Sequence, residues 1–306
     1  MPVKNGAQFL STSIRNIESN VLPDDEILVI NDGSTDGTSQ MLMAWSIKNK
    51  RVRVLNSSGV GLVSALNLGI SEAENKWIAR FDVDDQYTNS RIAEQRKLIE
   101  NPTAAIFCDY RFHDPRGKPL GVIPSAVDAD ATAVSLISSQ RTPHSGVIFN
   151  RESVLAVGGY REKDFPAEDI SLWLRLAKEN RIVSVPQILL EYRLSKNSVS
   201  AENRSLAMTK TTHLIRQIGI NKKHIIACLQ NWPEQFLDYS GMRYSSERKL
   251  LLFRDLQKSV GIFKGNASLH RETCQIAHNL LKDPQSIFGL KNLFVGKTQR
   301  MIFRVT

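Results

Sequence analysis

The stretch Trp77–Gln95, WIARFDVDDQYTNSRIAEQ, decides the fold that this chain is expected to adopt. Its apolar start, Trp77–Phe81, predicts a short strand that ends at the acidic cluster Asp82-Val83-Asp84-Asp85. Arg91–Glu100 then predicts a helix, which Pro102 stops. The order of strand, acidic turn and helix is typical of a βαβ unit, in which ligands bind beyond the carboxyl ends of parallel strands.

The same order recurs upstream of this stretch. The strands are predicted at Glu26–Asn31 and Arg51–Leu55, and the helices at 9–20, 37–48 and Gly59–Ala73. The first of these strands runs into a second acidic turn, NDGSTDGT, which contains Asp32. The repeated alternation predicts an α/β fold with a mostly parallel central sheet flanked by helices.

Downstream, strand and helix signals first mix and then only helix signals remain. The elements predicted there are a strand at Ser145–Asn150, a turn at Gly158–Tyr160, a helix at Asp169–Glu179 and short strands at Ile182–Val185 and Ile188–Tyr192, split by Pro186. Helical segments follow near 204–218, 222–230, 245–260 and 268–282. We therefore divide the chain into an α/β domain, residues 1–203, and a mainly helical region, residues 204–306.

The charge of the chain is divided in the same way. The 306 residues include 40 Lys/Arg and 31 Asp/Glu, a formal net charge of +9, and residues 201–306 alone hold 17 basic and 7 acidic residues. An apolar content of 42% excludes a disordered chain and a collagen-like repeat. Three distant cysteines fit a reducing cytosol better than a disulfide framework. No apolar run approaches the roughly 20 residues of a membrane-spanning helix.

Two acidic turns stand where such a sheet would bind a ligand. Close carboxylates repel one another when ionised, so Asp82, Asp84 and Asp85 favour a hard divalent cation such as Mg²⁺ or Mn²⁺ between them. A solvated turn that caps the next helix explains the same residues without any ligand. Asp32 can accept hydrogen bonds from a base or a ribose, but its turn also has a simple structural explanation.

Glu168 and Asp169 stand at the start of the helix predicted near residue 169. Carboxylates there interact favourably with the helix dipole, which is enough to explain them. A general base needs an ionised carboxylate held rigidly beside the acceptor, and the pair also meets that need. His144, in the segment TPHSG, is a ligand, a base or a satisfied polar residue, and the last is favoured for a lone histidine.

Eight segments, in this order and spacing, resemble the family 2 glycosyltransferases. They are PVKNGAQFL, EILVINDGSTDGT, GVGLVSALNLGI, WIARFDVDDQYTNSRIAEQ, PHSGVIFNRE, GGY, EDISLWLRL and ILLEYR, over about residues 2–193. The resemblance implies a nucleotide-sugar-binding α/β fold of the GT-A type, an inverting mechanism and a divalent metal. It also implies that Asp169 is the general base and that Glu168 positions it. Trp173 and Arg175 lie on the helix that carries the base, Trp173 as a packing residue.

The resemblance further implies a donor site. Asp82 and Asp84 match the DxD motif, with Asp84 in contact with Mg²⁺ or Mn²⁺, Asp82 nearer the ribose and Asp85 in support. Asp32 matches the carboxylate that recognises the nucleotide base. The remaining matched positions are Pro2 and Val3, which border the base, and Gly159 and Tyr160, which lie beside the sugar and the acceptor.

The chain departs from the family pattern at three places. Met1 stands directly before Pro2, so the apolar first strand of the family is expected to be missing, which would leave unpaired backbone groups beside a central position. We interpret this as a shortened sequence. Ser195, followed by Lys196, stands where the family often has a histidine, and Lys4 where it often has a tyrosine.

The basic last third allows three interpretations. One is a helical appendage with a solvated basic face. Another is a surface for anionic lipid headgroups, because Ile287–Arg304 mixes apolar side chains with four Lys/Arg. This surface would suit a lipid-linked acceptor at the inner face of the membrane. A nucleic-acid surface ranks last, since no zinc-finger spacing or RNA-binding motif is visible, and we expect no nucleic-acid partner.

The sequence therefore predicts an inverting, metal-dependent glycosyltransferase of bacterial surface or exported polysaccharide synthesis. A UDP-sugar is the expected donor, a glycan or lipid-linked glycan the acceptor, and the cytoplasm, with peripheral membrane contact, the location. One alternative is an inactive homologue that binds a nucleotide sugar, which the missing strand and Ser195 favour. A sugar nucleotidyltransferase is a weaker rival, because its glycine-rich phosphate loop is not visible.

Overall fold

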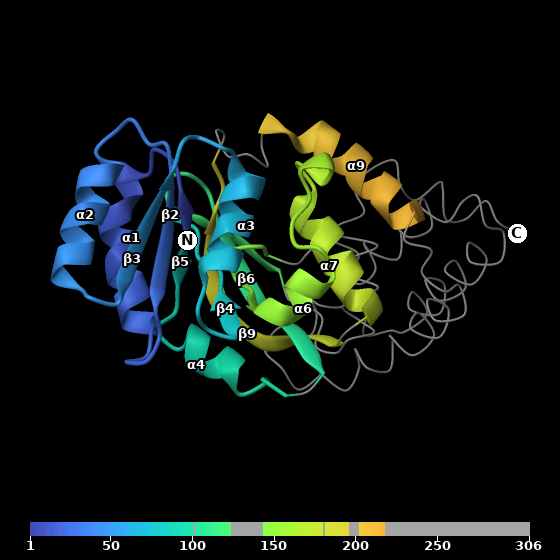
Figure 1. The fold of residues 1–306 in the computed structure, drawn as a ribbon. Coiled ribbons are helices and arrows are strands. Elements are labelled where there is room, and N and C mark those ends of the chain that lie inside the picture. Colours follow the sequence, from blue (N-terminus) through green and yellow to red (C-terminus); the bar gives the residue numbers. More distant parts are fainter. Residues whose placement is uncertain (101, 124–142, 180, 196–201, 218–306) are drawn as a thin grey trace, which may run out of the picture. The chain divides into compact units, whose positions relative to one another are not determined.

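The computed structural model describes residues 1–100, 102–123, 143–179, 181–195 and 202–217 (Figure 1). The chain divides into two compact units, and all the described residues belong to the first, Met1–Leu136 with Gln140–Gly219. The helices predicted near 222–230, 245–260 and 268–282 and the stretch Ile287–Arg304 lie outside the described residues. In the described part of the chain, every helix is too short or too polar to cross a bilayer.

The first sheet consists of three parallel strands. Their order is β1 (Pro2–Val3), β2 (Ile27–Asp32) and β3 (Val52–Ser57), and the associated helices are α1 (Ala7–Asn20), α2 (Thr38–Lys48) and α3 (Leu62–Glu72). In Figure 1, α3 lies on one side of this sheet and α1 and α2 on the other. The apolar run ILVI of β2 is buried because strands flank it and helices cover both faces. The strands and helices predicted for residues 9–73 are therefore confirmed.

The second sheet is mixed. Its path is β4 (Trp77–Ala79), β8 (Ile148–Asn150), β6 (Thr103–His113), β9 (Arg181–Arg193) and β5 (Gln86–Tyr87), and β7 (Pro119–Ile123) also pairs with β6. Only β6 and β9 run parallel in it, whereas the other described pairs are antiparallel. The helical elements that accompany it are α4 (Arg91–Arg96), α6 (Arg151–Ala156), the short 3₁₀ helix η1 (Glu162–Asp164), α7 (Glu168–Glu179) and α9 (Arg204–Gln217).

Two strands of this sheet differ from the expectation. The long central strand β6 was not predicted, although its segment Ala104–Cys108 is entirely buried. β9 is one continuous strand and not two strands split by Pro186. The partner of Val185 is Cys108 and the partner of Ile188 is Asp109, so two residues bulge out at the proline and the pairing resumes.

At the position of the family's first strand the chain has a strand of only two residues, Pro2 and Val3. Pro2 and Val3 pair with Ile30 and Asn31 of β2. The backbone of Met1 continues this pairing, because its nitrogen lies 2.8 Å from the oxygen of Leu28. Within the described residues, however, β1 pairs only with β2 and β4 only with β8, so each is the edge of its own sheet.

An apolar cavity of about 290 Å³ lies between these two edges. Its wall comes from Met1 and Pro2, from Ile27, Leu28 and Ile30 of β2, from Ala65, Leu66, Gly69 and Ile70 of α3 and from Trp77–Ala79 of β4, and it also includes polar side chains such as Glu26, Lys76 and Arg80. Each wall side chain therefore lacks packing neighbours on one side, which lowers the stability of the unit.

Gly69 offers a direct test of this cavity. It lies inside helix α3, and a methyl group there would make ordinary contact with Ile30, 3.5 Å away. Gly69→Ala should raise the free energy of unfolding by about 1 kcal/mol, because alanine stiffens the helix and fills space. Urea unfolding measures the change. Gly33→Ala is the opposite control, since Gly33 has φ +66° and its added carbon would lie 2.9 Å from the nitrogen of Gly59. A lower midpoint for Gly69→Ala would contradict the packing described here.

Candidate active site

The loop that follows β4 carries Asp82, Asp84 and Asp85. Two aromatic rings and one guanidinium group at its ends pack together and hold it in place. The rings of Phe81 and Tyr87 meet edge to face at 4.6 Å, and the Arg91 guanidinium lies 4.1 Å from the first ring and 4.4 Å from the second. The hydroxyl of Tyr87 also accepts a hydrogen bond from the backbone N–H of Asp82, 2.8 Å away. The loop is thus fixed by its own flanking residues.

Asp85 fastens this loop to the rest of the unit. Its carboxylate is buried and accepts hydrogen bonds from the Ser145 hydroxyl (2.6 Å) and the backbone N–H of Arg193 (2.9 Å). Burial, followed by the charge of Asp82, raises its pKa well above the usual range. Both oxygens of Asp85 therefore serve the protein itself.

Asp82 and Asp84 remain for a ligand. Asp82 is half-buried, and its carboxylate lies 2.5 Å from the guanidinium of Arg80. Burial, followed by the charge of Asp82, raises the pKa of Asp84. A divalent cation would relieve this repulsion, so the pair fits a metal that takes its other ligands from substrate phosphates. Among the described residues, no three His, Cys, Asp or Glu side chains are placed to hold a metal together.

The second carboxylate pair, Glu168 and Asp169, occupies the first turn of α7. Burial raises the pKa of Asp169 to about 6, and burial with the charge of Asp169 raises that of Glu168 to about 7. The backbone N–H of Ile170 donates to Asp169 over 2.7 Å, whereas one oxygen of Glu168 is buried without a hydrogen-bond partner in the described part. A carboxylate with a pKa near 6 is suited to accept a proton at neutral pH.

The glycine turn before η1 is clamped in place. Asn67 of α3 holds both backbone groups of Tyr160, at 2.9 Å each, and Arg175 donates to the oxygen of Gly159 over 2.7 Å. Gly159 has φ +59°, and a side chain there would lie 2.8 Å from Asn67. Only glycine therefore fits this position without strain.

His144 is a packed, neutral residue of the site. Its Nε2 lies 2.7 Å from the Tyr160 hydroxyl, and its ring meets Trp173 edge to face at 6.0 Å. Burial lowers its pKa well below the usual value and raises that of Tyr160. The sequence-based preference for a satisfied polar histidine agrees with this environment. Trp173 is completely buried, as a packing residue would be.

Asp32 lies at the end of β2 and holds the next loop. Its carboxylate accepts three hydrogen bonds, from the Ser57 hydroxyl (2.6 Å) and from the backbone N–H groups of Val60 (2.8 Å) and Gly61 (3.1 Å). Burial opposes ionisation, but these bonds and the charge of Lys4 lower its pKa. A carboxylate has about four acceptor positions, so about one remains for a ligand.

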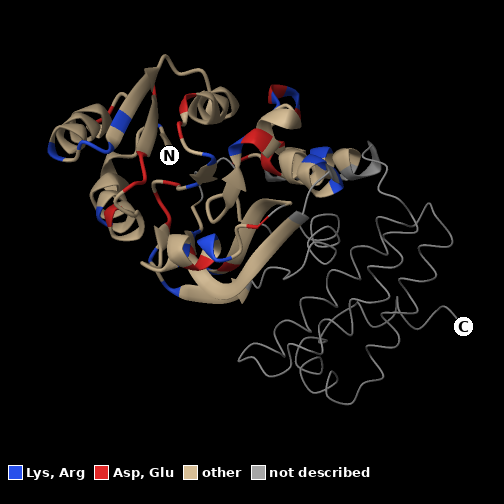
Figure 2. Cartoon of the chain, turned by 60° about the horizontal axis from the view of Figure 1, so that its bottom comes forward, with Lys and Arg blue, Asp and Glu red and all other residues tan. Residues whose placement is uncertain are grey.

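The predicted site residues do not all lie equally close to one another. Pro2 and Val3 adjoin the carboxylate loop, because a side chain at Gly6 would lie 2.7 Å from Val3 and 3.1 Å from Val83. Burial is the main cause of the raised pKa of Asp169, and the charge of Asp82 adds to it, so these two carboxylates lie within electrostatic range of one another. Acidic segments, drawn red, lie on loops near the N-terminus in Figure 2. Ser195 is described, whereas Lys196 lies outside the described residues.

Four site residues were not predicted from the sequence. They are Asn67, Arg80, Arg91 and Ser145, which position the turn and the loop described above. Each of them contacts a partner that is 11 or more residues away or lies in its own loop. No local sequence pattern therefore identifies these residues. The only local sign is a basic residue inside an apolar strand, as in WIARF.

Comparison with known proteins finds a family match for the first part of the chain. Residues 1–138 match the model described as "Glycosyl transferase family 2". An uncharacterized glycosyltransferase of Haemophilus influenzae is 28% identical, over 72% of this chain and 75% of that protein. A putative teichuronic acid biosynthesis glycosyltransferase, TuaG of Bacillus subtilis, is 25% identical over 71% and 86%. The chain spans only 29% and 32% of two longer Rickettsia relatives.

Solved structures share the fold. S. aureus TarS in complex with UDP-GlcNAc matches with a TM-score of 0.60 and 15% identity, over 95% of this chain and 88% of that chain. The mannosyltransferase PcManGT of Pyrobaculum calidifontis, in complex with GDP-Man and Mn²⁺, matches with a TM-score of 0.54 and 16% identity, over 92% and 86%. Identities this low concern the fold alone. Residues 1–138 thus match glycosyltransferase family 2, and the fold is the α/β fold of the GT-A type.

Proposed function

We propose that this chain is an inverting glycosyltransferase that moves a sugar from a nucleoside-diphosphate sugar to an acceptor hydroxyl. The observation that carries the proposal is the electrostatic interaction of Asp82, in the acidic loop after β4, with Asp169 of α7 in a GT-A fold. A UDP-sugar is the first donor to test, because TarS binds UDP-GlcNAc. The name of TuaG supports a role in surface or exported polysaccharide synthesis.

In the proposed reaction Asp169 removes the proton from the acceptor hydroxyl. The acceptor oxygen forms a bond to the anomeric carbon while the bond from that carbon to the diphosphate oxygen breaks, and one displacement inverts the configuration. Glu168 keeps Asp169 in position, and the turn of Gly159 and Tyr160 borders the sugar. The raised pKa of Asp169 supports its role, because a base with a pKa of about 6 is ionised at neutral pH and still accepts a proton.

The donor would lie between the two acidic turns. Asp32 has about one acceptor position left for the nucleotide base, and Pro2 and Val3 border the same region. Asp84, together with Asp82, would hold Mg²⁺ or Mn²⁺, and Mn²⁺ accompanies GDP-Man in PcManGT. When bound, the metal supplies positive charge to the departing diphosphate.

The proposal also covers the acceptor of the transferred sugar and the location of the protein. A glycan or a lipid-linked glycan is the proposed acceptor, made in the cytoplasm at the inner face of the membrane. The basic and apolar stretch Ile287–Arg304, which lies outside the described residues, is the proposed peripheral membrane contact.

The test is turnover across a panel of UDP-, GDP- and TDP-sugars with Mg²⁺, with Mn²⁺ and with a chelator. We expect slow hydrolysis of one donor that stops when the chelator removes the metal. Binding without turnover would instead identify an inactive nucleotide-sugar-binding homologue. Release of pyrophosphate from a nucleoside triphosphate and a sugar phosphate would identify a nucleotidyltransferase.

The pH dependence of transfer provides a second test of the base. Asp169 must be ionised to accept a proton, so kcat should rise with pH as its carboxyl loses a proton. Burial raises its pKa to about 6, so the acid limb should have its midpoint near that value and not near 3.8, the ordinary value of an aspartic acid. A profile of kcat from pH 4 to 9 at saturating donor measures this. A midpoint near 4 would contradict a buried carboxylate as the base.

A further inference from the structure

The most unusual charged group of the site is the buried Arg80. Its side chain is only 6% exposed, and one guanidinium nitrogen lies 2.5 Å from the carboxylate of Asp82. The other terminal nitrogen donates to the backbone oxygen of Phe81 over 2.5 Å. The backbone of Arg80 is fixed as well, because its N–H donates to Val147 (2.9 Å) and its oxygen accepts from Arg91 (3.0 Å).

The charge of Arg80 reaches both carboxylate pairs. Burial raises the pKa values of Asp84, Glu168 and Asp169, and the positive charge of Arg80 partly opposes each rise. Arg80 also disfavours a charged His144. The charged and titratable groups that face the Glu168–Asp169 pair are Arg80 and Asp82 after β4, Tyr160 in the glycine turn and Glu162 in η1. Arg80 is the positive group in this set.

Stability alone does not account for an arginine here. The Nε atom of Arg80 is buried and has no hydrogen-bond partner within the described ranges. A buried ion pair costs desolvation that its attraction repays only with complete hydrogen bonding, and an apolar side chain of similar size is often as stable or more so. The buried positive charge of Arg80 therefore indicates a role in the reaction at this site.

We propose that Arg80 is a positioning residue of the transfer reaction, which holds Asp82 beside Asp84 and carries the fixed positive charge between these carboxylates and the Glu168–Asp169 pair. This inference rests on the proposed function. Its two parts are separable, because lysine keeps the charge but loses the planar fork of arginine.

The experiment compares Arg80→Met and Arg80→Lys with the unchanged chain. Arg80→Met should lower kcat about 10- to 100-fold and move the acid limb up by about one pH unit. Arg80→Lys should keep the acid limb in place but still lose kcat, since lysine lacks the two terminal nitrogens with which arginine holds Asp82 and the backbone oxygen of Phe81. Arg53→Met is the matched control, because Arg53 lies on β3, is 37% exposed and pairs with Glu26 and Glu74. We expect its kcat and pH profile to be unchanged.

A second readout needs no substrate. Carboxyl ¹³C NMR follows the titration of Glu168 and Asp169, and we expect their pKa values to rise in Arg80→Met and to stay in Arg80→Lys. An Arg80→Met variant with unchanged titration or kcat would overturn the inference, and so would an Arg80→Lys variant with full kcat. If Arg80→Met does not fold, Arg80→Lys still tests the fork. Failure of the unchanged chain to turn over any donor would refute the proposed function instead. The NMR titration would still show whether the charge of Arg80 acts on Glu168 and Asp169.

Discussion

Replacing Asp169 by asparagine should lower kcat about a thousand-fold, because a positioned general base is worth that much in proton transfer. Asparagine keeps the size of the side chain and an oxygen for the N–H of Ile170, which donates to Asp169 over 2.7 Å. The helix and the donor site should therefore persist, and the Kd for the nucleotide sugar should stay the same. Steady-state transfer and calorimetric binding measure the two quantities.

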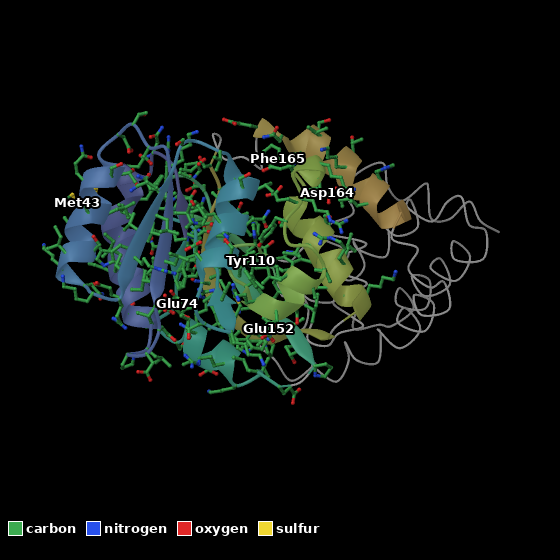
Figure 3. All side chains as sticks on the ribbon, in the orientation of Figure 1. Met43, Glu74, Tyr110, Glu152, Asp164 and Phe165 are labelled. Atoms are coloured by element: carbon green, nitrogen blue, oxygen red, sulfur yellow. The ribbon has the colours of Figure 1, made fainter. Side chains whose placement is uncertain are left out.

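The matched control for this variant is Glu152→Gln. Glu152 lies in the first turn of α6 and is exposed, so the change removes a carboxylate from a helix start away from the site (Figure 3). We expect full activity. Equal turnover of Asp169→Asn and the unchanged chain would remove Asp169 from the reaction. An equal loss of donor binding and turnover would mean that the variant damages the donor site.

Replacing Trp173 by alanine should lower the free energy of unfolding by about 3–5 kcal/mol. Trp173 is fully buried in α7, and its ring meets Phe107 edge to face at 5.2 Å and Phe149 at 6.2 Å. Its Nε1 has no hydrogen-bond partner in the part of the chain that the structure describes, so the loss is one of packing. The midpoint of urea unfolding measures it.

Two further variants serve as controls for this result. Trp173→Phe should lose less, because a smaller ring can still stack on Phe107. Met43→Ala should change stability by less than about 0.5 kcal/mol, since Met43 is 66% exposed at the surface of α2 (Figure 3). A Trp173→Ala variant as stable as Met43→Ala would contradict the burial described for α7.

The first hundred residues could be predicted because their signals are local. Apolar runs such as ILVI end at acidic, glycine-rich turns, and each turn begins a helix. The strand β6 also ends at a turn, Asp114–Lys118, but the strand β7 and not a helix follows it. The place of β6 between β8 and β9 depends on partners more than 40 residues away. The split at Pro186 was predicted from a sound rule, but a two-residue bulge lets the strand continue.

The site divides in the same way. Acidic residues after strands are visible in the sequence, whereas their supports are not. Asp85 is an example, because the sequence places it beside Asp84, but only the fold brings it to Ser145 and the backbone of Arg193. Arg80 could be noticed as a basic residue in an apolar strand, but its role depends on charges contributed by α7.

The cavity between β1 and β4 has a consequence for volume. The part of its roughly 290 Å³ that stays closed to water is lost on unfolding, so unfolding reduces the volume of the protein and its solvent. Hydrostatic pressure favours the state of smaller volume, and the change scales with the void that is lost. Pressure should therefore open this unit first along the seam between its two sheets, where Trp77 lines the cavity and would report the entry of water.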